Sequence, residues 1–234
     1  LFAEICEQAG LPPGVVNIVT GDGSTGSLIV NHKDINKIAF TGSTQVGKLI
    51  QKSLAGRDVG LTLELGGKAA NIVYEDAAID QAVEGVVNGI FFNQGHVCCA
   101  GSRLLLQESI HDQFVKKLEK RMQSLRVGNP LDKNTDIGAI NSKEQLDKIT
   151  SLVNEGVEDG GELFQTQCEL PGNGFWFRPS LFTNVQPSYS IAREEIFGPV
   201  LTTLTFRTPE EAVEIANNTE YGLSAGVWTE KGSK

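Results

Sequence analysis

The sequence has no apolar run approaching the roughly 20 residues that a membrane-spanning helix requires. It also lacks an excess of positive charge: 20 lysine and arginine residues face 29 aspartate and glutamate residues, for a net charge of -9. Neither nucleic acid nor an anionic membrane is therefore expected as a partner. Internal repeats and low-complexity tracts are absent too. What remains is the class of globular enzymes and binding proteins.

Cysteine is scarce, and its spacing is not that of a disulfide framework. The cysteines are Cys6, Cys98, Cys99 and Cys168. This usage fits a reducing compartment, and we expect a cytoplasmic protein. The chain opens on Leu1 within what reads as a helix, so we expect a piece of a longer chain in which no targeting signal can be judged. With 234 residues, it has material for one or two domains.

The adjacent cysteines lie in a predicted connection between a helix and a strand. Apolar residues recur at helical spacing from Ile79 to Phe91, and Arg103 to Gln107 is a short apolar run typical of a strand. Gly95 suits the positive φ that follows a helix end. Such a loop can hold a thiol beside backbone N–H groups, which favour a thiolate and can bind an oxyanion. A pair of cysteines taken alone is more often a core feature.

A carboxylate gives the second sign of a site. Leu61 to Leu65 reads as a strand that Gly66 and Gly67 end, so Glu64 lies at a carboxyl end, where ligands bind in open α/β sheets. A solvated strand end is the ordinary alternative. Predicted strands and helices alternate between Lys37 and Gln107, which favours a parallel sheet and an α/β fold class.

Two glycine-containing loops match parts of phosphate-binding motifs. Gly21 to Gly26 is a G-x-G-x-x-G between a strand predicted at Val15 to Val19 and a helix, but it lacks the acidic residue expected about 20 positions later. Gly42 to Lys48 matches most of a P-loop, but Leu49 replaces the hydroxyl that would hold magnesium, which disfavours a P-loop nucleotidase. Ser43 is a candidate phosphate ligand or a simple helix cap.

The second half of the chain gives fewer signals. Ser142 to Gln145 is a capping box that opens a helix, and Glu155 to Gly161 is predicted to be a loop. Trp176 to Val185 is predicted to be extended, with Pro179 indicating a sheet edge.

Taken together, the motifs resemble those of the aldehyde dehydrogenase superfamily. The matching stretches are Phe40 to Thr44, Leu63 to Lys68, Phe92 to Arg103 and Glu194 to Pro199, in the family's order. Members of the family are about twice as long, so the chain resembles their middle. The resemblance implies the end of a Rossmann-type cofactor domain over residues 1–66 and an α/β catalytic domain over residues 67–234.

The resemblance also implies a reaction. Cys98 would attack an aldehyde carbonyl, hydride would pass to NAD or NADP, and Glu64 would activate the water that hydrolyses the resulting thioester. Cys98 is chosen over Cys99 because the family's nucleophile lies three residues after the loop glycine, here Gly95. No metal is implied. The implied cofactor contacts are Gly21, Gly42, Ser43, Leu65, Gln145, Lys148, Glu195 and Phe197.

These contacts have distinct implied roles. Glu195 would bind the nicotinamide ribose, and Phe197 would pack beside the nicotinamide ring. Gln145 and Lys148 would face the ribose region, although helix capping and a surface position explain them equally well. The parent protein is expected to be a homodimer or homotetramer acting on an aldehyde whose identity the sequence leaves open.

The chain departs from the family's pattern beside the nucleophile. His96 stands where glutamine is usual, and Val97 directly precedes Cys98. The alternative to an enzyme is a family member that serves as a scaffold, and a weaker similarity to the family's sixteenth branch, some members of which lack the cysteine, keeps it open. Both reacting residues are present here, which favours the enzyme. The segment alone is expected to be inactive.

Overall fold

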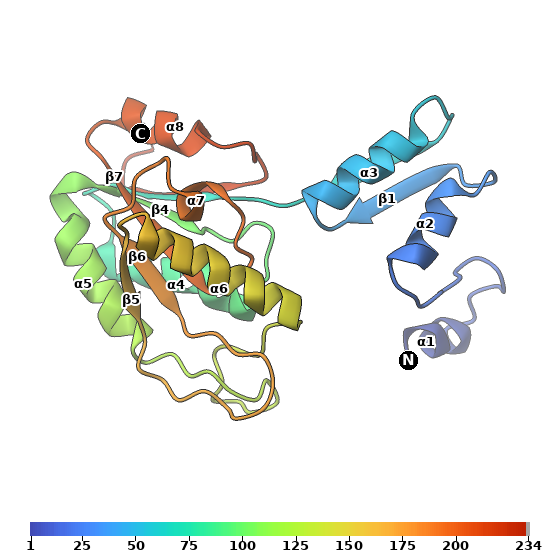
Figure 1. The fold of residues 1–234 in the computed structure, drawn as a ribbon, viewed down its shortest axis with the longest axis horizontal. Coiled ribbons are helices and arrows are strands. Elements are labelled where there is room, and N and C mark those ends of the chain that lie inside the picture. Colours follow the sequence, from blue (N-terminus) through green and yellow to red (C-terminus); the bar gives the residue numbers. More distant parts are fainter. Residues whose placement is uncertain (233–234) are drawn as a thin grey trace. The chain divides into compact units, whose positions relative to one another are not determined.

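The computed structural model describes residues 1–232 and divides into unit 1 (Leu1–Leu65) and unit 2 (Gly66–Lys234), shown in Figure 1. Unit 1 contains α1 (Phe2–Gln8), α2 (Gly23–Asn31), β1 (Lys37–Thr41), α3 (Thr44–Leu54) and β2 (Gly60–Glu64). Unit 2 contains β3 (Ala70–Val73), α4 (Ile79–Phe91), η1 (Phe92–Gly95), β4 (Arg103–Gln107), η2 (Glu108–Ile110), α5 (His111–Met122), α6 (Lys143–Glu158), β5 (Glu162–Gln165), β6 (Ser180–Thr183), α7 (Ser190–Arg193), β7 (Val200–Phe206), α8 (Pro209–Asn217) and β8 (Ala225–Trp228). No helix in the described range is both long and apolar enough to cross a membrane.

Unit 1 is built on a pair of parallel strands. β1 pairs with β2 in a register that runs from Lys37 opposite Gly60 to Thr41 opposite Glu64. The buried apolar side chains of this unit come from α2, β1 and α3, and they are Val30, Ile38, Ile50 and Leu54. The strand that begins at Lys37, the strand predicted at Leu61 to Leu65 and the helix that follows Ser43 are therefore confirmed.

The strand predicted at Val15 to Val19 is wrong. The segment has no strand conformation, and Val15 and Val19 are 63% and 68% exposed. A strand persists only where a neighbour satisfies its backbone groups. Within residues 1–232, no segment forms a ladder with this one, so its apolar composition alone does not make it a strand.

Unit 2 contains a six-stranded sheet in the order β5-β6-β7-β4-β3-β8. Every neighbouring pair is parallel except β5 with β6. This arrangement confirms the α/β class and the parallel sheet expected from alternating strands and helices. The antiparallel pair at one edge is a hairpin-like addition that alternation did not predict.

Both faces of this sheet are covered by helices (Figure 1). In β4, Leu104 and Leu106 pack with α4 and α5, whereas Leu105 packs with α6 and α7 on the other face. All three leucines are 0% exposed. A strand buried on both faces reads as a continuous apolar run, which is why β4 shows no alternation in the sequence.

Two further predictions in unit 2 are wrong. Residues 155–158 form the last turn of α6 instead of a loop, because a Cβ at Gly156 would lie 3.1 Å from Ile191 and Phe182, so this glycine serves close packing and not chain reversal. Pro179 does not mark an edge strand, since β6 lies between β5 and β7. Proline precedes the strand, where its missing N–H removes no bond from the ladder.

Candidate functional site

Three of the sequence motifs in unit 2 lie at the end of the sheet where the parallel strands begin. Gly66 to Lys68 leads into β3, the cysteine loop leads into β4, and Glu194 to Pro199 leads into β7. These strands are parallel, with Ala70 opposite Arg103 and Arg103 opposite Thr202. Because parallel strands all begin at the same edge, the segments that precede them converge there.

The cysteine loop is a strained reversal between α4 and β4. Asn93, Gln94 and Gly95 have φ values of 50°, 48° and 76°, so the left-handed region extends beyond the glycine that the sequence singled out. Cys98 and Cys99 follow in a turn that the N–H of Ala100 closes by donating to the carbonyl of Val97 at 3.0 Å. Backbone strain of this kind gathers at functional sites.

Cys98 is half-buried and Cys99 is exposed. Within the described part of unit 2, no atom accepts a hydrogen bond from the backbone N–H of Cys98. This donor lies next to the thiol and is available to an oxyanion that forms when a carbonyl is attacked at sulfur. The arrangement suits nucleophilic catalysis at Cys98.

Gly66 and Gly67 lie between the other two segments. The N–H of Gly67 donates to Glu195 Oε1 at 3.0 Å. A Cβ added at Gly66 would lie 2.3 Å from Glu195 Oε2, and one added at Gly67 would lie 2.2 Å from the carbonyl oxygen of Cys98. Two glycines are thus required for the backbone to pass between the carboxylate and the cysteine turn.

The start of α6 holds the segment that contains Glu195 and Phe197. Gln145 Nε2 donates to the carbonyls of Ile196 and Phe197 at 2.8 and 3.0 Å, and Lys148 Nζ donates to the carbonyl of Glu195 at 2.7 Å. Phe197 has a φ of 55°, a conformation that costs a residue with a side chain about 1–3 kcal/mol. These bonds to successive carbonyls stabilise the strained backbone.

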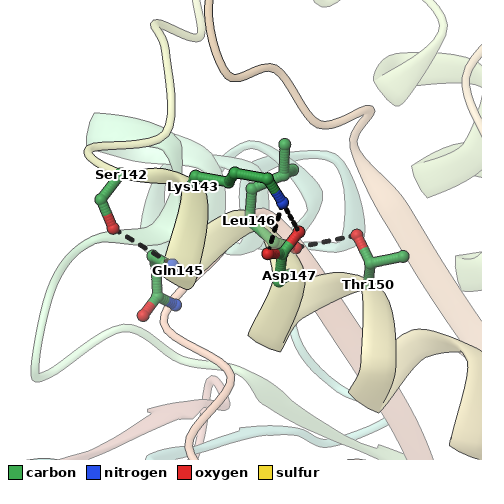
Figure 2. A network of polar contacts seen from close by, with 6 residues as sticks. All are labelled: Ser142, Lys143, Gln145, Leu146, Asp147 and Thr150. Atoms are coloured by element: carbon green, nitrogen blue, oxygen red, sulfur yellow. Dashed lines mark hydrogen bonds and ion pairs between the residues drawn. The ribbon is translucent and has the colours of Figure 1, made fainter.

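Figure 2 shows how α6 begins. Ser142 caps the helix by accepting from the N–H of Gln145 at 3.1 Å, which confirms one half of the predicted capping box. The ion pair of Lys143 with Asp147 at 2.6 Å and the bond from Thr150 to the carbonyl of Leu146 at 2.8 Å support the first two turns. The other half of the box is wrong, because the Gln145 side chain does not return to the Ser142 N–H but donates to the carbonyls of Ile196 and Phe197.

The cysteine loop and the Phe197 segment touch through backbone atoms. A Cβ at Gly95 would lie 2.1 Å from the carbonyl oxygen of Gly198. We expect Gly95→Ala to lower the free energy of unfolding of the full-length protein by about 3 kcal/mol, through this clash and through the positive φ. The matched control is Gly172→Ala, where nothing lies within 4 Å. Equal thermal midpoints for the two variants would show that the contact is not rigid.

Two basic side chains, Lys68 and Arg103, are buried beside the segments of the site. Lys68 is 1% exposed, its Nζ has no hydrogen-bond partner in the described structure, and burial lowers its pKa to about 7. Arg103 is 3% exposed, burial lowers its pKa, and it donates to the carbonyls of Lys68, Ile215 and Ala216 at 2.8 to 3.0 Å. The nearby carboxylates Glu195 and Glu194 favour the charged form of Lys68, but burial outweighs them.

The remaining predicted residues lie in unit 1. Ser43 caps α3 by accepting from the N–H of Val46 at 3.3 Å, and Asp22, in the loop after Gly21, caps α2 in the same way. The N–H of Gly42 donates to the carbonyl of Glu64 at 3.0 Å, which joins two candidate residues at the ends of β1 and β2. The Glu64 side chain is exposed. Leu65 packs against Gly47, where a Cβ would lie 2.6 Å from the leucine side chain.

The structure thus brings the predicted residues together in two sets. Unit 2 gathers Cys98, Gln145, Lys148, Glu195 and Phe197, and unit 1 gathers Gly42, Ser43, Glu64 and Leu65, with Gly21 in a separate loop. Glu64 and Cys98 belong to different units, so their joint action in one site stays a prediction. The sequence interpretation gave no role to Lys68 or Arg103. The signal for both was a charge directly before an apolar stretch, Ala69 and Ala70 after Lys68 and Leu104 to Leu106 after Arg103.

Comparisons with known proteins agree with these motifs. A model described as the aldehyde dehydrogenase family matches residues 1–234. Retinal dehydrogenase 2 of Rattus norvegicus is 48% identical over 228 residues, which cover 96% of this chain and 44% of the relative. The chain therefore spans less than half the length of that relative.

Solved structures show the same similarity. An NAD-dependent aldehyde dehydrogenase from Sinorhizobium meliloti matches with a TM-score of 0.95 and 43% identity, over 99% of this chain and 46% of the other. The NAD+ complex of an aldehyde dehydrogenase from Bacillus cereus matches with a TM-score of 0.95 and 40% identity, over 99% and 47%. These matches give no support to the particular similarity to the sixteenth branch.

Proposed function

Because the chain belongs to the aldehyde dehydrogenase family, we propose that its parent protein oxidises an aldehyde to a carboxylic acid with NAD+ or NADP+. The observation that carries the proposal is the convergence of the Cys98 turn, Gly66 to Lys68 and the Glu195 segment at one edge of the sheet. A scaffold protein has no need for strained glycine-lined backbone at such a point.

Cys98 is the nucleophile in this proposal. Its sulfur forms a bond to the aldehyde carbon, and the carbonyl oxygen becomes an oxyanion that the free backbone N–H of Cys98 stabilises. Loss of hydride from that carbon leaves a thioester on the sulfur. The turn closed by Val97 and Ala100 holds the thiol in place during both steps.

The nicotinamide cofactor supplies the hydride acceptor when bound. The residues of unit 2 suit its ribose and ring: Gly67 fixes one oxygen of the Glu195 carboxylate, and a side chain at Gly66 would fill the space against the other. Gln145 and Lys148 orient this binding segment through its carbonyls. In unit 1, the Ser43 hydroxyl at the start of α3 offers a donor to a phosphate, and Gly42, Leu65 and Gly21 are further contacts.

Glu64 completes the cycle as a general base. It takes a proton from the water that attacks the thioester carbon, and it passes that proton to the sulfur as the carbon–sulfur bond breaks, so that Cys98 is released as the free thiol and the carboxylic acid departs. Glu64 suits this role because it ends β2 with an exposed carboxylate, next to the Gly66 and Gly67 backbone that leads into the site.

The test uses the full-length protein with NAD+ and NADP+ and a panel of aldehydes, followed through absorbance of the reduced cofactor. The wild type is expected to turn over with at least one aldehyde. Glu64→Gln is expected to release one equivalent of reduced cofactor per active site in a burst and then turn over about a hundredfold more slowly, because only deacylation is impaired. Nucleotide binding without turnover on any aldehyde would contradict the proposal and favour a scaffold.

A further inference from the structure

His96 and Phe197 form a stacked pair of rings that joins the cysteine loop to the cofactor segment. Their centroids lie 5.2 Å apart and their planes differ by 5°. We propose that His96 is a positioning residue, whose imidazole sets the orientation of the Phe197 ring against the nicotinamide. The inference rests on the proposed function, since the orientation of the Phe197 ring matters only if a nicotinamide cofactor binds beside it.

The backbone of Phe197 is already fixed, but its ring needs a separate support. Gln145 and Lys148 bind carbonyl oxygens of residues 195–197, which constrains the main chain and the left-handed φ of 55°. None of these bonds acts on the aromatic side chain. The parallel face of His96 lies against the ring, and offset parallel stacking is one of the two favoured aromatic geometries.

The chemistry of His96 indicates that the flat face of the imidazole is what the position uses. Its Nε2 is buried and has no hydrogen-bond partner within residues 1–232. Burial also lowers the pKa of the imidazole, which favours the neutral ring. A buried nitrogen left without a partner is unfavourable. The stacking of the imidazole on Phe197 is a favourable contact that offsets this penalty.

The residues beside the pair hold the two rings in register. Gly95 precedes His96, and Gly198 follows Phe197. These two glycines meet through their backbones, because a Cβ at Gly95 would lie 2.1 Å from the Gly198 carbonyl oxygen. A Cβ at Gly198 would in turn lie 2.6 Å from the Ile149 side chain of α6. A shift of the cysteine loop therefore moves the imidazole ring of His96 relative to the Phe197 ring.

The test compares His96→Leu with His96→Phe in the full-length protein. The leucine removes the flat ring, and the phenylalanine keeps it without the nitrogens. We expect His96→Leu to raise the dissociation constant of NADH about fivefold in fluorescence titrations, with His96→Phe restoring binding to near the wild-type value. His111→Leu, a histidine of the same unit at the start of α5, is the matched control.

A double-mutant cycle with Phe197→Leu separates positioning from general packing. If His96 acts through Phe197, His96→Leu adds no further loss of NADH affinity once Phe197 is leucine. Full additivity, or equal losses in His96→Leu and His96→Phe, would overturn the inference. Wild-type protein that binds NADH without oxidising aldehydes would refute the proposed function while the binding arms still decide the role of His96. Failure of the wild type to bind either nucleotide would refute both.

Discussion

Cys98→Ser is expected to lower aldehyde oxidation by the full-length protein at least about 10³-fold, because a serine hydroxyl ionises far less readily than a thiol and is a much weaker nucleophile than a thiolate. The substitution keeps the size of the side chain and the turn from Val97 to Ala100. Cofactor binding should therefore persist. The measurement is the rate of NADH formation at saturating aldehyde, alongside the dissociation constant of NADH.

Cys99→Ser provides the matched control from the neighbouring position. Cys99 is exposed, and its carbonyl accepts from Ser224 Oγ at 3.3 Å through the backbone, so the substitution leaves that contact in place. Its turnover should stay close to that of the wild type. Loss of turnover in Cys99→Ser with turnover retained in Cys98→Ser would move the nucleophile to Cys99.

Lys68→Met is expected to stabilise the protein at acidic and neutral pH. Burial lowers the pKa of Lys68 from 10.5 to about 7, so the folded state holds its proton less tightly than the unfolded state. Between pH 7 and 10.5 the unfolded chain binds more protons, and stability rises with pH. Below pH 7 the lysine is charged in both states, and the whole difference in pKa between them destabilises the fold. At 1.36 kcal/mol per pKa unit, this destabilisation amounts to at most about 5 kcal/mol.

The gain should shrink as the pH rises through that range, because the lysine is then neutral in the folded state, and it should disappear above pH 10.5, where the lysine is neutral in both states. Thermal midpoints or urea midpoints at pH 6 and pH 10 measure the difference. Lys116→Met, an exposed lysine on α5, is the control for loss of one positive charge. A gain from Lys68→Met that does not change with pH would show that methionine acts by packing and that the buried amine carries no electrostatic penalty.

The site in unit 2 was predictable because its motifs and strands are both local signals. Residue type alone indicates a turn at Gly66 and Gly67 and another at Gly95, and it indicates a buried strand from Arg103 to Gln107. The convergence of three segments follows once those strands are parallel. The roles of Gln145 and Lys148 needed the structure, since capping and a surface position explained them equally well and the partner carbonyls are about 50 residues away.

Pairwise contacts of individual side chains were beyond the sequence. His96 was visible only as a departure from the family's glutamine, and nothing in its neighbourhood indicated Phe197 as its partner. Lys68 follows two glycines, where a solvated lysine is the ordinary expectation, and the charges that act on it, those of Arg103, Lys148 and Glu195, come from distant parts of the chain. The false strand at Val15 to Val19 has the same origin, since strand formation requires a neighbour that composition does not specify.

Three segments of the candidate site lie directly before β3, β4 and β7. The number of residues between each motif and its strand therefore determines where the motif lies in the site. Each residue of a parallel strand advances the chain by about 3.3 Å and reverses the direction of the side chain. Deleting Ala69 would therefore either draw Lys68 into the ladder or pull the Gly67 amide away from Glu195, with which it forms a 3.0 Å bond. Residues that touch no ligand thus set the dimensions of the site, and insertions or deletions there should be tolerated less well than substitutions.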